Sequence, residues 1–222
     1  MWHDKCAMKV GTDGVLLGAW ADVSHVRSVL DVGTGTGLVA LMIAQRCGAD
    51  ITAVEIDESA VLQAKENVLR SPWTDRISVV QEDFTNFDSS EKFDLIVSNP
   101  PYFVDSLQSP DQQRTVARHT SSLTYWNLVE KATELLSDNG RFTLIIPTEA
   151  ADSVKSFAMQ NRLFLIKQTY IITKPGTVSK RTLLSFSFNQ KELQENQLLI
   201  ELSRHQYSKE YIELTKEFYL KM

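Results

Sequence analysis

The order of apolar runs between residues 28 and 188 is the strongest constraint on the fold. Short runs rich in β-branched residues alternate there with segments that have the spacing of amphipathic helices. This alternation is typical of a mostly parallel sheet covered by helices. The expected strands are residues 28–33, 50–56, 76–81, 93–98, 141–147, 162–173 and 181–188, and the expected helices are residues 38–47, 57–70, 125–136 and 149–160.

The last two expected strands are joined by the short loop KPGTVS at residues 174–179. A Pro-Gly loop between two β-rich runs predicts an antiparallel hairpin. We therefore expect an α/β fold whose sheet has seven strands, mostly parallel, with one antiparallel strand in a C-terminal hairpin. We expect a single domain in which residues 1–25 precede a core over 28–188, and a C-terminal helix lies within 205–222.

Composition excludes several classes of protein. The chain has 222 residues, of which 43% are hydrophobic, as expected for one globular domain. We expect neither a membrane span nor a signal peptide, because no apolar run is long enough and no basic-then-apolar leader is present. The expected location is therefore the cytoplasm.

A metal site is not expected, because the four histidines have no metal-ligand spacing. The two cysteines, Cys6 and Cys47, are far apart and are expected to be reduced thiols. The net charge of −5 argues against attraction of phosphates to the whole surface. Only a local basic surface would bind nucleic acid.

A glycine-rich turn, DVGTGTGL at residues 31–38, follows the first expected strand. Gly33, Gly35 and Gly37 allow a tight turn and a close approach of a ligand to the main chain at a helix N-terminus. A dinucleotide-binding loop has its third glycine where this chain has Leu38. The spacing therefore disfavours NAD, and the turn alone is a weak signal for a nucleotide-like cofactor.

Acidic residues stand at the ends of the first three expected strands. These are Asp31, Glu55 and Asp83. Because ligands of open α/β sheets bind at the carboxyl edge, we expect these three residues and the glycines to bind one cofactor. Glu55 is placed to accept hydrogen bonds from ribose hydroxyls, and Asp83 from the amino group of an adenine.

The fourth expected strand, FDLIVS at 93–98, ends in Asn99, Pro100, Pro101 and Tyr102. Two consecutive prolines neither continue a strand nor enter a helix interior. They place an amide side chain, a rigid carbonyl and an aromatic ring at the edge where the cofactor is expected.

Together, DVGTGTG, VEID, the acid after the third strand and NPPY resemble the class I S-adenosylmethionine-dependent methyltransferases over nearly the whole chain. The resemblance implies a Rossmann-like sheet and a planar amino nitrogen as acceptor. CAMKVGTDGVLLGAWA (6–21) and the KPG and SKRTLLSF stretches resemble the bacterial enzymes that methylate N6 of adenine 37, next to the anticodon, in a valine tRNA. S-adenosylmethionine and a tRNA anticodon loop are then the expected cofactor and partner, and the protein is expected to be a monomer.

The expected catalytic residues are Asn99, Pro100, Pro101 and Tyr102. The Asn99 side-chain oxygen and the Pro100 carbonyl would each accept one amino hydrogen, so that the nitrogen lone pair faces the methyl group, and Tyr102 would stack on the base. The resemblance implies that Asn99, Lys9 and Thr12 also contact the cofactor. A loop and helix cap is the alternative for Thr12 and for Asp13, which lies in the same stretch.

Basic and aromatic residues near the corner are candidates for RNA binding. They are Phe103, Arg114 and Arg118 in the long segment after the corner, and Lys180 and Arg181 at the hairpin. Other functions remain open. These are methylation of a guanine amino group in rRNA or of a protein glutamine, a non-catalytic cofactor-binding RNA chaperone, and a nucleotide-dependent oxidoreductase.

Overall fold

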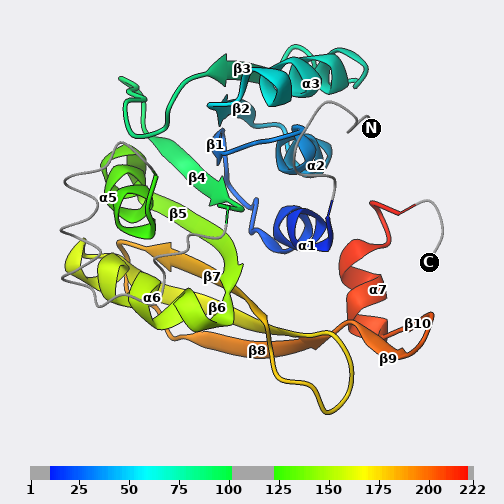
Figure 1. The fold of residues 1–222 in the computed structure, drawn as a ribbon. Coiled ribbons are helices and arrows are strands. Elements are labelled where there is room, and N and C mark those ends of the chain that lie inside the picture. The colour runs from blue at the N-terminus through cyan, green and yellow to red at the C-terminus, as the bar shows by residue number, and fades with distance from the viewer. Residues whose placement is uncertain (1–10, 102–122, 220–222) are drawn as a thin grey trace.

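The computed structural model describes residues 11–101 and 123–219, and its centre is one large sheet (Figure 1). The strands of this sheet are β1 Ser28–Val32, β2 Asp50–Glu55, β3 Ile77–Gln81, β4 Phe93–Ser98, β5 Leu136–Pro147, β6 Phe164–Ile172, β7 Arg181–Ser187 and β8 Gln194–Leu199. Their order is β3-β2-β1-β4-β5-β7-β6-β8. Two short strands, β9 Glu201–Ser203 and β10 Gln206–Tyr207, pair separately.

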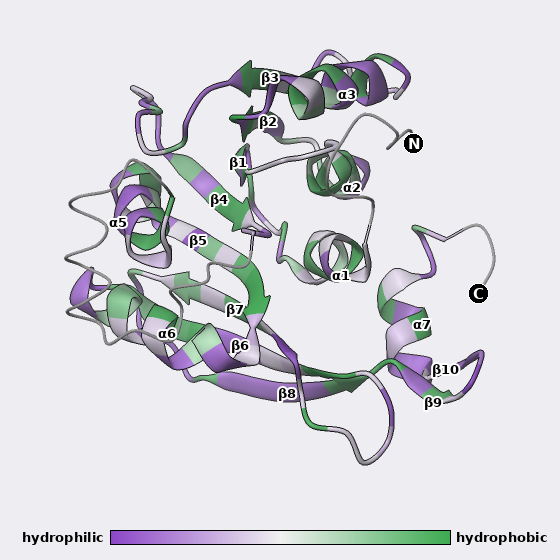
Figure 2. Ribbon diagram, in the orientation of Figure 1, coloured by the Kyte–Doolittle hydropathy of each residue, from purple (hydrophilic) through white to green (hydrophobic). Residues whose placement is uncertain are grey.

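The strand directions confirm the predicted α/β fold. Strands β1 to β5 pair in parallel, and β7 is antiparallel to both of its neighbours, β5 and β6. The predicted count of seven strands is wrong, because β8 adds an eighth strand in parallel with β6. Figure 2 shows that β8 is mostly hydrophilic, and its first four residues are exposed. A polar edge strand carries no apolar alternation by which the sequence could reveal it.

Helices cover both faces of the sheet (Figure 1). One face carries α1 Thr12–Trp20, α2 Leu38–Arg46 and α3 Glu58–Leu69, and the other carries α5 Tyr125–Leu135 and α6 Ala151–Gln160, which follows the short 3₁₀ helix η2 Thr148–Ala150. Apolar residues form a separate core on each face. Successive strand residues enter opposite cores, as Leu95 and Ile96 do, which explains why the central strands are continuously apolar.

Helix α1 was not predicted by the sequence pattern. From Gly14 to Trp20 every residue is buried, so the helix has no polar face to reveal it. Its glycines allow close packing on α2, since a Cβ atom on Gly18 would lie 2.8 Å from the Met42 sulfur. The Arg46 side chain then donates hydrogen bonds to the carbonyls of Gly18 and Ala21, which end α1.

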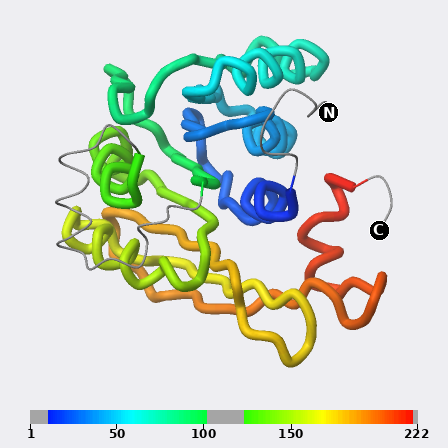
Figure 3. Tube along the Cα trace, viewed as in Figure 1, coloured from blue at the N-terminus to red at the C-terminus, as the bar shows by residue number. Residues whose placement is uncertain are grey.

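The C-terminal helix predicted within 205–222 is shorter than expected. It is α7 Lys209–Thr215, and Ser208 caps it by accepting a 3.0 Å hydrogen bond from the Tyr211 amide. Residues 206–207 belong to β10 instead. Figure 3 shows α7 beside α1, so both ends of the described chain meet on one side of the molecule. Leu214 and Phe218 pack there against the cluster that includes Val15 and Ala19 of α1.

Gly140 gives a test of this packing. The expected helix at 125–136 and strand at 141–147 leave Gly140 outside both elements, but the structure has β5 running from Leu136 through Gly140. A Cβ on Gly140 would lie 2.7 Å from the Leu136 side chain and 2.9 Å from the Phe93 carbonyl oxygen. We expect Gly140→Ala to lower the free energy of unfolding by about 1–3 kcal/mol, measured by urea denaturation.

Gly48→Ala is the matched control for that substitution. A Cβ on Gly48 has nothing within 4 Å, and its φ is not positive. This variant should unfold within about 0.5 kcal/mol of the parent protein. Equal stability of the two variants would show that the strand relaxes around the new methyl group.

Candidate functional site

The glycine-rich turn lies between β1 and α2 with its main chain exposed to a ligand. Gly33, Gly35 and Gly37 have φ angles of 68°, 57° and 80°, in the left-handed region that favours glycine. A Cβ on Gly33 or Gly35 would have nothing within 4 Å. The turn is fixed to the neighbouring strand, because the amides of Gly33 and Thr34 both donate to the Val54 carbonyl. The backbone is therefore held rigidly while its outer side stays open.

Asp31, in β1, forms hydrogen bonds with this turn and with the start of α2. Its Oδ2 accepts a 2.6 Å hydrogen bond from the Thr34 hydroxyl and a 3.1 Å bond from the Ala40 amide. The side chain is 1% exposed. Burial raises the pKa of Asp31 to about 6, against the opposing effect of these two bonds. The carboxylate is thus mostly ionised at neutral pH, and it ties the turn to the first residues of α2.

Glu55 links the end of β2 to the same turn. Its Oε2 accepts a 2.9 Å hydrogen bond from the Gly35 amide, and its Oε1 accepts bonds of 2.9 and 3.0 Å from the amides of Ile56 and Asp57. The orientation of the carboxylate is therefore fixed by three backbone donors. Asp31 and Glu55 therefore both contact the glycine-rich turn at this edge, Asp31 through Thr34 and Glu55 through the Gly35 amide.

Asp83 follows β3 at the next position along this edge. Its Oδ1 accepts hydrogen bonds of 2.9 Å from the Thr85 amide and 2.8 Å from the Thr85 hydroxyl. The Glu82 amide also donates to the Glu55 carbonyl, which fixes the end of β3 to the end of β2. Asp83 is half-buried and keeps a second carboxylate oxygen outside these bonds.

The corner after β4 lies on the other side of the turn. Ser98 is paired in register with Val32 at the end of β1, and its buried hydroxyl donates a 3.0 Å hydrogen bond to the Val32 carbonyl. Asn99 is half-buried, Pro100 is buried and Pro101 is exposed. Among the described residues, none forms a hydrogen bond with the Asn99 side chain. The amide is therefore available to a ligand next to the glycine-rich turn.

Residues 9–169 match the family described as the methyltransferase small domain. The chain belongs to this family. It is 60% identical over 222 residues to the tRNA1(Val) (adenine(37)-N6)-methyltransferase of Bacteroides thetaiotaomicron. The alignment covers 99% of this chain and 94% of the Bacteroides protein. It is 46% identical to the protein of the same name in Haemophilus influenzae, and that alignment covers 99% of this chain and 94% of the Haemophilus protein.

Solved methyltransferases have the same fold. A crystal structure titled a "predicted O-methyltransferase" from Agrobacterium tumefaciens superposes with a TM-score of 0.72, at 20% identity, over 92% of this chain and 96% of that one. The glycopeptide N-methyltransferase MtfA in complex with S-adenosylmethionine superposes with a TM-score of 0.59, at 16% identity, over 82% of this chain and 90% of the MtfA chain. The resemblance to class I methyltransferases found in the sequence is confirmed.

The methyltransferase places Lys180 and Arg181 at the same edge of its sheet. Because β7 is antiparallel, its first residue, Arg181, pairs with the last residue of β5, Pro147. Lys180 is exposed, whereas the Arg181 Nε forms a 2.9 Å ion pair with Asp13 in the first turn of α1. Arg181 therefore fixes the start of α1 to the hairpin, a contact that the sequence did not predict.

Thr12 is the first residue of α1 and is exposed, and the cap position is Gly11. The alternative interpretation of Thr12 as a helix cap is therefore wrong. Several other candidates lie outside the described residues. They are Lys9, Tyr102, Phe103, Arg114 and Arg118.

Asn67 is a residue of the site that the sequence pattern did not indicate. It lies on α3, is 4% exposed, and its Nδ2 donates a 2.9 Å hydrogen bond to the Thr36 carbonyl within the glycine-rich turn. Its signal in the sequence is an amide on the buried face of the helix, beside Ala64 and Val68, a face that also carries the buried amide of Gln63. Such a residue at a buried position requires a hydrogen-bond partner.

The part of the chain that the structure describes contains no group of three or more His, Cys, Asp and Glu side chains placed to hold a metal ion. In the same part, no helix has the length and apolar character needed to cross a membrane.

Proposed function

We propose that the protein transfers a methyl group from S-adenosylmethionine to N6 of adenine 37 in a valine tRNA. The corner at Asn99 and Pro100 carries this proposal, since it places two hydrogen-bond acceptors beside an open glycine-rich turn. The full-length relatives named as tRNA1(Val) (adenine(37)-N6)-methyltransferases support the choice of substrate.

The residues at the turn fit this cofactor. The open main chain at Gly33 and Gly35 leaves room for close approach of the cofactor. Glu55 would accept hydrogen bonds from the ribose hydroxyls through the lone pairs that the backbone leaves free, and Asp83 would accept one from the adenine amino group. When bound, S-adenosylmethionine supplies a methyl group that is already electrophilic.

The task left to the protein is to position the acceptor nitrogen. Asn99 Oδ1 and the Pro100 carbonyl would each accept one hydrogen of the amino group, which fixes its orientation so that the nitrogen lone pair, perpendicular to the ring plane, points at the methyl group. Both prolines hold φ near −65°, so the direction of the Pro100 carbonyl is fixed. Tyr102 would stack on the adenine after the base leaves its neighbours.

No strong base is required in this scheme. Asn99 Oδ1 and the Pro100 carbonyl are both neutral acceptors. Asp31, the carboxylate on the adjacent strand, is buried against Thr34 and the Ala40 amide. The methylated amine is cationic and acidic, so its proton passes to water after the transfer.

Lys180, among the residues that the structure describes, is a cation placed to contact the RNA backbone. It is exposed, and β7 lies two strands from the corner, which is about 10 Å at normal strand spacing. We also propose that the enzyme works in the cytoplasm with its tRNA. A monomer would suffice, because one chain supplies all of the proposed residues.

Lys180→Glu is expected to weaken tRNA binding and to reduce the slope of log affinity against log salt by about 1. The reason is that one phosphate contact and its released counterion are lost. Fluorescence anisotropy at several salt concentrations measures both quantities. Lys65→Glu, an exposed lysine on α3, is the control that changes the charge equally and should leave the slope unchanged. Equal slopes in both variants would remove Lys180 from the RNA surface.

The test of the proposed function is incubation of the protein and radiolabelled S-adenosylmethionine with total tRNA from a strain lacking the enzyme. The expected result is label in N6-methyladenosine at position 37 of a valine tRNA. Label in a guanine or in a protein glutamine would establish one of the alternatives. Cofactor binding with no transfer would establish the non-catalytic alternative.

A further inference from the structure

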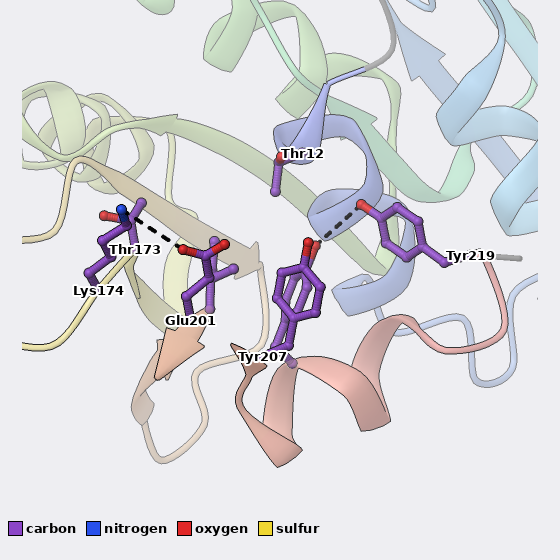
Figure 4. A pocket seen from close by; sticks show the side chains of 8 residues that line it. Thr12, Thr173, Lys174, Glu201, Tyr207 and Tyr219 are labelled. Carbon is purple, nitrogen blue, oxygen red and sulfur yellow. Dashed lines mark hydrogen bonds and ion pairs between the residues drawn. The ribbon is translucent and has the colours of Figure 1, made fainter. Parts of the chain in front are cut away.

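A pocket lies at the carboxyl edge of the sheet, beyond the corner at Asn99. It has a volume of about 300 Å³, is partly open to solvent and is lined by residues of the β6–β7 connection, β9, β10, α7 and the start of α1 (Figure 4). The side chains important for its chemistry are Thr12, Lys174, Glu201, Tyr207, Tyr211 and Tyr219. Its volume is at the lower end of the range for small-molecule sites, which corresponds to a single nucleobase or nucleoside.

Three tyrosines form one side of the pocket. The rings of Tyr207 and Tyr211 have centroids 5.3 Å apart, and the hydroxyls of Tyr211 and Tyr219 lie 3.2 Å apart. Tyr211 is buried, whereas Tyr207 and Tyr219 are 37% and 38% exposed. Burial raises the pKa of Tyr211, so its phenol stays neutral in solution. The pocket therefore offers two accessible aromatic rings anchored on a buried third ring.

The charges of the pocket favour a base over a phosphate. The Glu201 carboxylate lies 4.0 Å from the Lys174 ammonium, and their side chains are 22% and 64% exposed, respectively. The carboxylate is thus the more deeply placed charge, and it would accept a hydrogen bond from an N–H group of a base while repelling a phosphate. Lys174 stands at the rim, where the backbone of a bound nucleotide would lie.

The position of the pocket matches a second contact on the substrate. Thr173 and Ile200 directly follow β6 and β8, which are parallel to each other and end at the same edge as β4. From β4 to β6 there are three strand spacings, about 14 Å in all. That distance corresponds to a few nucleotides of single-stranded RNA. Unstacked bases in RNA loops are typically bound on aromatic side chains.

We propose that this pocket binds a second, unstacked base of the substrate RNA, a few nucleotides from the methylated adenine, through the rings of Tyr207 and Tyr219 and the Glu201 carboxylate. The inference rests on the proposed function, because it requires RNA as the substrate. It adds a contact that would help select the RNA loop, separate from the residues that hold the adenine.

The test measures RNA binding without turnover, in the presence of S-adenosylhomocysteine and on whichever tRNA transcript the wild-type protein binds. Tyr207→Ala and Tyr219→Ala are each expected to weaken binding by about 10-fold or more, the usual effect of losing one stacked base. Tyr219→Phe keeps the ring and should bind almost as the wild type does. Leu202→Ala, on the same β9 strand and 54% exposed, is the matched surface control and should have no effect.

A second series tests the base itself. Single abasic nucleotides are placed within a few positions of the acceptor, and one of them should weaken wild-type binding as much as Tyr219→Ala does. Combining that abasic RNA with Tyr219→Ala should cause no further loss, because both changes remove the same contact. Glu201→Gln, which is similar in shape, should weaken RNA binding several-fold.

Three outcomes would overturn the inference. They are unchanged RNA affinity in both tyrosine-to-alanine variants, a loss of cofactor affinity alone, and tighter RNA binding by Glu201→Gln, which would indicate a phosphate in the pocket. The proposed function is tested by a separate measurement. It fails if the wild-type protein transfers no methyl group to adenine.

Discussion

Asn99→Ala is expected to lower the single-turnover rate of methyl transfer to tRNA by about 10²- to 10³-fold, with cofactor affinity changed by only a few-fold. The side chain follows Ser98, which is fixed to the end of β1, and it lies half-buried with no hydrogen bond to a described residue. Alanine removes one of two acceptors for the amino group. The nitrogen lone pair is then no longer held towards the methyl group.

The character of the replacement separates this role from a structural one. Asn99→Asp keeps an acceptor oxygen and should retain more activity than Asn99→Ala, although both remove the amide. Asn86→Ala, an exposed asparagine in the turn after Asp83, is the matched control and should transfer methyl groups at the wild-type rate. Wild-type turnover by Asn99→Ala, with cofactor affinity intact, would remove Asn99 from the mechanism.

The alternation of apolar runs predicted the centre of the sheet because buried parallel strands are apolar on both sides. The sequence pattern did not reveal helix α1, because the helix is buried almost all round and contains Gly14 and Gly18. Those glycines act through close packing against Leu38 and Met42, a property of two helices together. The sequence of either helix alone does not indicate this close packing.

The end of the chain was harder to predict. The first four residues of β8 are exposed, so the strand is defined by its hydrogen bonds to β6 and has little apolar character. A C-terminal helix was expected within 205–222, but Ser208 determines where α7 begins. The pocket formed by Tyr207, Tyr211 and Tyr219 depends on both elements and was therefore not foreseen.

The candidate site was largely predictable because parallel strands bring their carboxyl ends to one edge. Asp31, Glu55 and Asn99 could be assigned to that edge from their positions after strands. The contacts that position them could not, because Asn67 reaches the turn from a helix and Arg181 reaches Asp13 from a strand far along the chain. Such pairs require the three-dimensional arrangement of the elements.

Glu55→Gln is expected to weaken binding of S-adenosylhomocysteine by about 10- to 100-fold, the usual cost of losing hydrogen bonds to a charged acceptor. In the wild-type protein both carboxylate oxygens accept backbone N–H groups, from Gly35 on one side and from Ile56 and Asp57 on the other. A glutamine in either orientation turns its NH₂ group towards one of these donors. The turn then loses a bond to the strand end, and the ribose loses an anionic acceptor. Isothermal titration calorimetry measures the change.

A cofactor analogue distinguishes the ribose contact from a general loosening of the turn. The 2′,3′-dideoxy form of S-adenosylhomocysteine should bind the wild-type protein more weakly, yet should lose little further affinity in Glu55→Gln, because the hydroxyls and the carboxylate form the same contact. Glu58→Gln, an exposed glutamate in the first turn of α3, removes the same charge and should bind both ligands normally. If the two losses at Glu55 are instead additive, the carboxylate positions the glycine-rich turn without touching the ribose, and its action on the cofactor passes through Gly35.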